Sequence, residues 1–274
     1  MWKKLWFNGE IGKRLRLAQQ RGIIKLDHDR KRLRLSSHVM SFDHPWLHVG
    51  AGTQCRNCCL WKDVMFETLS FIPEFCRLRC YKVVAKIGGK YNKHGVREVI
   101  QLHGLMNALP FMYGLITTVP GKVGSDTRPY TDAPWSAYWY ADGLEQGQEY
   151  HELISKAIKE HFHEDIPVIL KQSCTEMERS HPSREDDFWK TFTQDERNFQ
   201  SHIEDMFEIE YDMAIQPDWV KNHIVQNWLE TANMMGDKSG VDFLGQDTLT
   251  VSATTFHKKE VMSEDEEGLT KEKV

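Results

Sequence analysis

The cysteines of this chain are concentrated in one short stretch. Five of the six cysteines lie between residues 44 and 80, at Cys55, Cys58, Cys59, Cys76 and Cys80. The C-x-x-C turn from Cys55 to Cys58 places two thiolates on one side of a tight turn, where they can bind a single metal ion. A predicted short helix separates this pair from a second pair, Cys76 and Cys80. These four thiolates predict a metal-binding module over residues 44–80.

Two kinds of metal centre suit four cysteine ligands. Zinc would form a closed tetrahedral site, whereas a [4Fe-4S] cluster would use the same four thiolates around a larger body. The three residues between Cys76 and Cys80 are not typical of a zinc-binding turn, so both centres stay open. His44 or His48 could replace a cysteine, and Cys59 is a further candidate ligand. Without a metal, the cysteines would be small buried side chains.

Residues 81–174 alternate between strand and helix patterns. Strands are predicted, from β-branched and aromatic runs, at 81–87, 111–119, 135–141 and 166–171. Apolar residues at helical spacing predict one helix from Val96 to a boundary at Pro110 and another that Asp142 would cap. The order strand, helix, strand, strand, helix, strand predicts an α+β fold with a ferredoxin-like (βαββαβ) core.

This topology would bring a sixth cysteine, Cys174, to the metal-binding module. The first and last strands of such a sheet are antiparallel neighbours, so the start of one lies beside the end of the other. Cys80 directly precedes the first predicted strand, and Cys174 follows the last one by three residues. We therefore expect Cys174 to join Cys76 and Cys80 as a metal ligand. Alternatively, Cys174 could be a nucleophile, which would need a positive environment and a base such as His181.

The strand predicted at 135–141 is rich in aromatic residues. Alternation places Trp135 and Trp139 on one face and Tyr138 and Tyr140 on the other. One face must pack on the two helices. The opposite face would be an aromatic platform for stacking nucleic-acid bases if it is open, or a second buried layer if the C-terminal helices cover it.

The histidines that follow this strand give no helical metal site. His161 and His163 are two residues apart, so they face different sides of the helix that also contains His151. We therefore expect no shared metal ion on that helix.

The charge of the chain is unevenly distributed. Residues 1–35 contain eleven Lys and Arg against three acidic residues, a charge of +8, which leaves −13 for the remainder. A basic segment of this kind can bind nucleic acid by releasing counterions, or it can dock on an acidic surface of its own protein. Alternation within residues 23–35 predicts a short hairpin there.

We expect five parts in the chain. They are a basic N-terminal arm (1–43), the cysteine-rich metal-binding module (44–80), the ferredoxin-like core (81–174), a mainly helical region (175–256) and a disordered charged tail (257–274).

The sequence also limits the functions to consider. It has no apolar run long enough to span a membrane and no apolar segment typical of a secretory leader, so we expect a cytoplasmic protein with reduced cysteines. It has no phosphate-binding G-x-x-x-x-G-K-[ST] loop, H-E-x-x-H or G-x-S-x-G. The function predicted is a metal-binding protein that binds nucleic acid through its basic arm or binds a protein partner. The alternative is an iron–sulfur or zinc enzyme with the cysteine cluster at its active site.

Overall fold

The computed structural model describes a large part of the chain, and the account below is confined to it. The described residues are 13, 17, 20, 24–27, 32–35, 45–50, 66, 70–182, 187–205, 207–208 and 216–244. Cys55, Cys58, Cys59, His44 and the predicted tail at 257–274 lie outside them. The described chain is a mixed α+β fold built on an antiparallel sheet.

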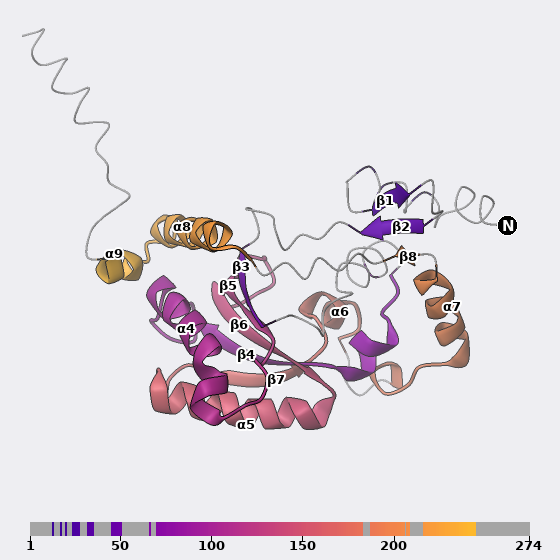
Figure 1. Ribbon diagram of the computed structural model, residues 1–274, viewed down its shortest axis with the longest axis horizontal. Helices are drawn as coiled ribbons and strands as arrows, with labels where there is room; N and C mark the ends of the chain where they lie inside the picture. Colours follow the sequence, from indigo (N-terminus) through magenta and orange to yellow (C-terminus); the bar gives the residue numbers. More distant parts are fainter. Residues whose placement is uncertain are drawn as a thin grey trace, which may run out of the picture.

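Five of the described strands form this sheet, in the order β3–β5–β6–β4–β7. Their bounds are Trp46–Val49 for β3, Cys80–Ile87 for β4, Gly121–Ser125 for β5, Trp135–Asp142 for β6 and Val168–Gln172 for β7. All neighbouring pairs are antiparallel, and Val83 at the middle of β4 pairs with Trp139 on one side and Leu170 on the other. Figure 1 shows the five strands in this spatial order.

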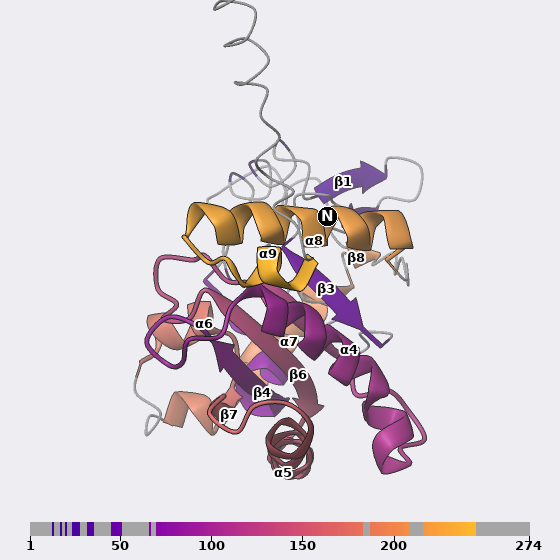
Figure 2. The same cartoon turned by 90° about the vertical axis from the view of Figure 1, so that its left-hand side faces the viewer.

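Two long helices cover one face of the sheet. α4 (Val96–Tyr113) packs on β5, β6 and β3, and α5 (Leu144–His161) packs on β6, β4 and β7. α8 (Asp218–Met234) packs on α4 and β3, so that α8 and α5 lie at opposite sides of the molecule in both views (Figures 1 and 2). α9 (Ser239–Leu244) contacts α4. None of the described helices is long and apolar enough to cross a membrane.

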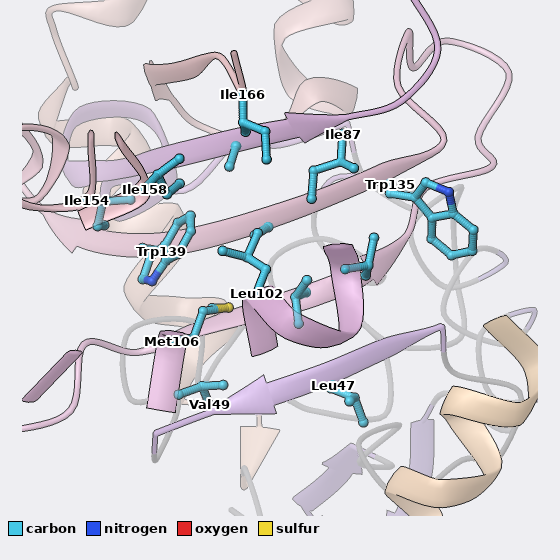
Figure 3. Packing of buried hydrophobic residues seen from close by; sticks show 14 of the residues in the cluster. Leu47, Val49, Ile87, Leu102, Met106, Trp135, Trp139, Ile154, Ile158 and Ile166 are labelled. Carbon is cyan, nitrogen blue, oxygen red and sulfur yellow. The ribbon is translucent and has the colours of Figure 1, made fainter. Parts of the chain in front are cut away.

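The main core lies between these helices and the sheet. Trp139 packs beside Ile154 and Ile158 of α5, and Leu102 and Met106 of α4 extend the same layer (Figure 3). These five side chains are almost fully removed from solvent. Burial of each such side chain stabilises the fold by about 1.5–3 kcal/mol. The helix-covered face of the sheet therefore contains the largest buried apolar cluster given by the described residues.

Two smaller units flank the core in the chain. β1 (Ile24–Asp27) pairs antiparallel with β2 (Arg32–Leu35), which confirms the predicted hairpin, and β2 pairs in parallel with β8 (Phe207–Glu208). A short π-helical turn, η2 (Phe75–Arg79), directly precedes β4. The remaining described elements are α6 (Thr175–Ser180), the 3₁₀ turn η3 (Asp187–Trp189) and α7 (Gln194–Glu204).

The strand predicted at 111–119 is wrong. α4 continues through Pro110 to Tyr113 and ends at Gly114, which adopts the left-handed conformation with φ of 62°. A proline so close to the end of a helix removes only one hydrogen bond, and the carbonyl of Pro110 accepts the N–H of Leu115 at 2.9 Å. The strand lies instead at β5, outside every strand predicted from the sequence.

The predicted cap of α5 is also wrong. Asp142 is the last residue of β6, and Gly143 occupies the N-cap position with a left-handed φ of 95°. The carboxylate of Asp142 instead accepts two hydrogen bonds from Arg79, at 2.8 and 2.6 Å. The arginine therefore competes successfully for the side chain that would otherwise cap the helix.

Candidate functional site

The face of the sheet opposite α4 and α5 collects lysines and aromatic residues. Alternation along β4 sends Val83 and Ala85 into the main core and turns Lys82 and Val84 to the opposite side. Antiparallel register aligns the neighbouring strands with this alternation. We call the resulting surface the lysine face, composed of Trp46, Cys80, Lys82, Val84, Lys86, Lys122, Tyr138, Tyr140 and Lys171.

A buried lysine and a buried cysteine meet on this face. The ammonium nitrogen of Lys82 lies 3.0 Å from Sγ of Cys174. Two features of the turn after β7 place the thiol there. Ser173 adopts a left-handed φ of 62°, uncommon for a residue with a side chain, and its N–H donates to the carbonyl of Cys80 at 2.7 Å. A neighbouring cation favours the thiolate form of a cysteine, which is the form that binds metals and attacks electrophiles.

Aromatic rings surround the lysines of this face. Nζ of Lys82 lies 5.5 Å from the ring centroid of Tyr140 and 5.9 Å from that of Tyr138. Nζ of Lys122 lies 4.2 Å from the ring of Trp46, which contacts Tyr138 edge to face. Such contacts stabilise a cation by about 0.5–2 kcal/mol, with the larger values in desolvated sites.

The lysine face is not an open stacking platform. Trp46 and Tyr138 are buried together with Val84, so their rings are not presented to a base. The described C-terminal helix α8 contributes its buried residues to the main core rather than to this cluster. The buried layer predicted as the alternative to a platform is therefore present, but packing by α8 does not account for it.

A network of charged groups adjoins Tyr138. Arg128 forms two hydrogen bonds to the carboxylate of Asp126, both 2.7 Å long, and a third to Glu176 in α6 at 2.5 Å. The hydroxyl of Tyr138 donates to Asp126 at 2.8 Å. Burial raises the pKa of Tyr138, and the negative charge of Asp126 raises it further. The two carboxylates raise the pKa of Arg128 although its burial acts in the opposite direction.

These ion pairs hold α6 against the sheet. Arg128 links the loop after β5 to Glu176 in the first turn of α6. Lys171 of β7 donates to Thr175 at 2.8 Å and to Glu178 at 2.5 Å. Because Cys174 is the residue directly before α6, the same contacts keep its thiol on the lysine face.

The described cysteines are only partly brought together. Cys76, Cys80 and Cys174 are all reduced and buried. The antiparallel β4–β7 pairing, predicted from the strand order, brings the N–H of Ser173, the residue before Cys174, to the carbonyl of Cys80. Among the described residues, however, these three thiols do not form a group of ligand atoms close enough for one metal ion. Cys55 and Cys58 lie outside the described residues.

The structure places two of the histidine candidates, His48 and His181, on different elements. The backbone N–H of His48 in β3 donates to Gln216 at 2.9 Å. His181, the candidate base for Cys174, stacks on Phe188 with ring centroids 3.8 Å apart, and its Nδ1 lies 2.9 Å from the hydroxyl of Ser180. Lys82, not His181, is therefore the ionisable group shown beside the thiol of Cys174.

A buried arginine connects the cysteine-containing turn η2 to the C-terminal region. The guanidinium of Arg77 donates to the carbonyl of Thr191 and to the carboxylate of Glu196, with a shortest contact of 2.7 Å to the latter. Its carbon Cζ lies 4.0 Å from the ring centroid of Phe188. Burial acts to raise the pKa of Glu196, but the hydrogen bonds from Arg77 and Thr193 and the charge of Arg77 together outweigh it, so the pKa falls to about 2. No sequence pattern indicates the role of Arg77, because it is one arginine among many.

His94, Glu98 and His163 form a further group that was not predicted from the sequence. One potential ligand atom from each residue lies within 4.8 Å of the others, the only such group found within the described ranges. His163 is distant in sequence from His94 and Glu98, and the packing of the start of α4 against the loop after α5 brings it beside them.

Comparison of the chain with protein-family models, curated proteins and solved structures yields no match.

Proposed function

We propose that this chain is a thiolate metal-binding protein with its metal site at one end of the central sheet. Its four thiolate ligands are drawn from five cysteines, namely Cys80 and Cys174 at the sheet, Cys76 in the adjoining turn, and Cys55 and Cys58. The observation that supports this proposal is the 3.0 Å contact between Lys82 and Cys174, because the ammonium favours the thiolate that a metal requires. The metal is zinc or a [4Fe-4S] cluster.

The charge of Lys82 also suits a four-thiolate metal site. Four thiolates carry more negative charge than a divalent ion neutralises, and burying the excess is costly unless a cation is near. Lys82 supplies such a cation from within the buried side of the sheet. Lys82 would also stabilise a [4Fe-4S] cluster, which is sensitive to hydrogen bonds and charges near its sulfur atoms.

The arrangement proposed for the fold is ferredoxin-like. The support is the element order β4–α4–β5–β6–α5–β7, the antiparallel spatial order β5–β6–β4–β7 and the position of both helices on one face. β3 would then be an addition beside β5. In this arrangement the start of β4 and the end of β7 meet at one end of the sheet, where the cysteine ligands are proposed.

The partner proposed for this module is nucleic acid, bound through the basic segment 1–35; a protein partner is the alternative. The support is charge, since the eleven Lys and Arg of this segment exceed its three acidic residues. For a single-stranded oligonucleotide, the logarithm of the association constant should fall linearly with the logarithm of the salt concentration. A titration without binding, or with salt-independent binding, would exclude the nucleic-acid partner and leave the protein partner.

A second candidate function is an enzyme with the cysteine site at its active centre. The buried network of Asp126, Arg128 and Tyr138 beside Lys82 and Cys174 favours it, because buried groups with shifted pKa values are frequent in active sites. In such an enzyme one ligand position would be open to water or substrate. Turnover that is lost together with the metal would support this candidate.

Elemental analysis and the visible spectrum of anaerobically purified full-length protein test the metal proposal. A colourless protein with about one zinc per chain would indicate a zinc site, and iron with sulfide and broad visible absorption would indicate a cluster. Cys174→Ser should lower the metal content. Met177→Leu is the control, because this buried neighbour in α6 is not a candidate ligand and the substitution conserves its volume, and it should retain the metal.

Two results would contradict the proposal. Unchanged metal content in the Cys174→Ser variant would remove Cys174 from the site. A wild-type protein that is folded by circular dichroism and contains no metal after purification, and takes up neither zinc nor iron, would exclude the metal-binding function altogether.

A further inference from the structure

The start of α4 and the loop between α5 and β7 bring two histidines and a glutamate together. His94 lies two residues before α4, Glu98 lies in its first turn and His163 lies in the loop after α5. Their potential ligand atoms all lie within 4.8 Å of one another. We propose that His94, Glu98 and His163 bind a divalent transition-metal ion, at a site separate from the cysteines.

The orientation of His94 supports this site. Its Nε2 lies 2.7 Å from a carboxylate oxygen of Asp165. Histidines that bind metals usually donate the N–H of the other ring nitrogen to a carboxylate, which fixes the tautomer and makes the ligating nitrogen more basic. With Nε2 held by Asp165, Nδ1 is the nitrogen left to bind a metal, and no hydrogen bond joins it to another described residue.

Glu98 is already held in place. Its side chain is 1% exposed, one carboxylate oxygen accepts the N–H of Gly95 at 2.8 Å, and the other accepts Nε of Arg97 at 2.7 Å. A carboxylate oxygen has two lone pairs, so Glu98 can cap the helix and still coordinate an ion. The metal would compete with Arg97 for one oxygen, and the partial exposure of Arg97 lets its side chain swing away.

The local charge favours a cation although the site lies at a helix N-terminus. The helix dipole places positive charge there, which by itself opposes a metal ion. Asp237 accepts the N–H of Val96 at 2.8 Å and, together with Glu98 and Asp165, adds negative charge around the site. Arg97 is the cation in direct contact with Glu98. Three carboxylates therefore offset one guanidinium and the helix dipole.

The position of His163 is compatible with a change on metal binding. Its ring stacks on that of His94, with centroids 4.1 Å apart and planes inclined by 25°. A metal lies in the plane of each imidazole that binds it, and ligand atoms around tetrahedral zinc are about 3.3 Å apart for bonds of about 2.0 Å. The stack must therefore open. No described residue is hydrogen-bonded to the ring of His163, so its rotation breaks no hydrogen bond.

The donor set points to the class of metal. Two imidazoles with one carboxylate suit zinc, cobalt, nickel or ferrous iron better than calcium or magnesium, which prefer oxygen ligands. Three protein ligands also leave positions for water. This site does not depend on the cysteine proposal, because none of its ligands is a thiolate.

Titration of the metal-depleted full-length protein with Co²⁺ tests the site. Cobalt bound to nitrogen and oxygen gives weak d–d absorption, whereas cobalt bound to thiolate adds an intense near-ultraviolet charge-transfer band. We expect a class of cobalt sites that lacks the charge-transfer band. The variant His163→Gln removes one ligand and should lower the cobalt affinity of these sites by more than about tenfold. His161→Gln, a change of the partly exposed histidine two residues earlier, is the matched control and should leave it unchanged.

A second variant separates metal binding from folding. Glu98→Gln removes the carboxylate charge, but glutamine can still accept the N–H of Gly95 and keep the cap. This variant should remain folded and lose cobalt affinity by more than about tenfold. Equal cobalt affinity in wild type, His163→Gln and Glu98→Gln would overturn the proposal, as would a wild-type titration in which every bound cobalt shows thiolate charge transfer.

Discussion

The ammonium of Lys82 lies 3.0 Å from the thiol sulfur of Cys174, and both side chains are buried. This contact joins the first half of β4 to the turn after β7, two segments that only the antiparallel β4–β7 pairing unites. Arg128 and Lys171 hold α6 and therefore the thiol in this position. The position of Cys174 thus depends on side chains from β4, the loop after β5, β7 and α6.

Lys82→Met should make Cys174 less reactive toward iodoacetamide at pH 7. Methionine keeps the length of the side chain but removes the cation that favours the thiolate, so the rate should fall several-fold. Peptide mapping by mass spectrometry after timed alkylation of metal-depleted protein measures this rate. Lys86→Met is the matched control, because Lys86 lies on the same face of β4 and pairs with Asp132 instead. An equal fall in both variants would contradict a specific role for Lys82.

Arg128→Met should destabilise the protein by about 3 kcal/mol, because it leaves the buried carboxylate of Asp126 without its cation. Urea unfolding followed by circular dichroism measures the change in free energy. The double variant Asp126→Leu/Arg128→Met should recover part of the loss, since it removes the unpaired charge as well. If the double variant loses more unfolding free energy than the two single variants lose together, this explanation is contradicted.

Regular apolar patterns allowed much of the central sheet to be predicted. β4 and β6 start within one residue of their predicted starts, because their alternation and aromatic content are strong. β5, with the sequence GKVGS, has little strand propensity, and its formation depends on contacts with other strands. The small size of Gly124 is required by the close approach of Pro45, a relationship that no local pattern contains.

The contacts at the candidate sites differ in how far they could be predicted from the sequence. The antiparallel pairing of β4 with β7, in which the N–H of Ser173 donates to the carbonyl of Cys80, followed from the expected strand order. The contact of Cys174 with Lys82 did not, because it depends on the left-handed turn at Ser173. The approach of His94 to His163 depends on the packing of a helix start against a distant loop, which spacing along the chain does not encode.

Gly124→Ala should destabilise the protein by more than about 2 kcal/mol. A Cβ atom at this position would lie 2.0 Å from the carbonyl oxygen of Pro45, which also accepts the indole N–H of Trp228. β3 must therefore move away from β5 or lose these contacts. Thermal unfolding measures the effect, with Gly104→Ala as control because nothing lies within 4 Å of the added Cβ in α4. The control should be neutral or stabilising, as alanine favours helices.

Glu196→Gln should lower stability at neutral pH and have much less effect in acid. The pKa of Glu196 is about 2 in the folded protein, below its ordinary value of 4.5, because Arg77 binds the ionised form. A lowered folded-state pKa adds stability above about pH 4.5, and this contribution is lost as the pH falls toward 2. Because the side chain of Glu196 is 29% exposed, solvent screens the ion pair, and we expect it to contribute about 1–2 kcal/mol to the free energy of unfolding at pH 7.

Urea unfolding of wild type and Glu196→Gln at pH 7 and pH 3 measures this contribution. The difference in unfolding free energy between the two proteins should shrink by more than half at pH 3, because the unfolded wild type is then protonated at this residue while the ion pair with Arg77 weakens. Asp195→Asn, a change of the exposed neighbour in the same first turn of α7, controls for the helix dipole. A difference that is the same at both pH values would show that Glu196 stabilises the protein by packing rather than by its charge.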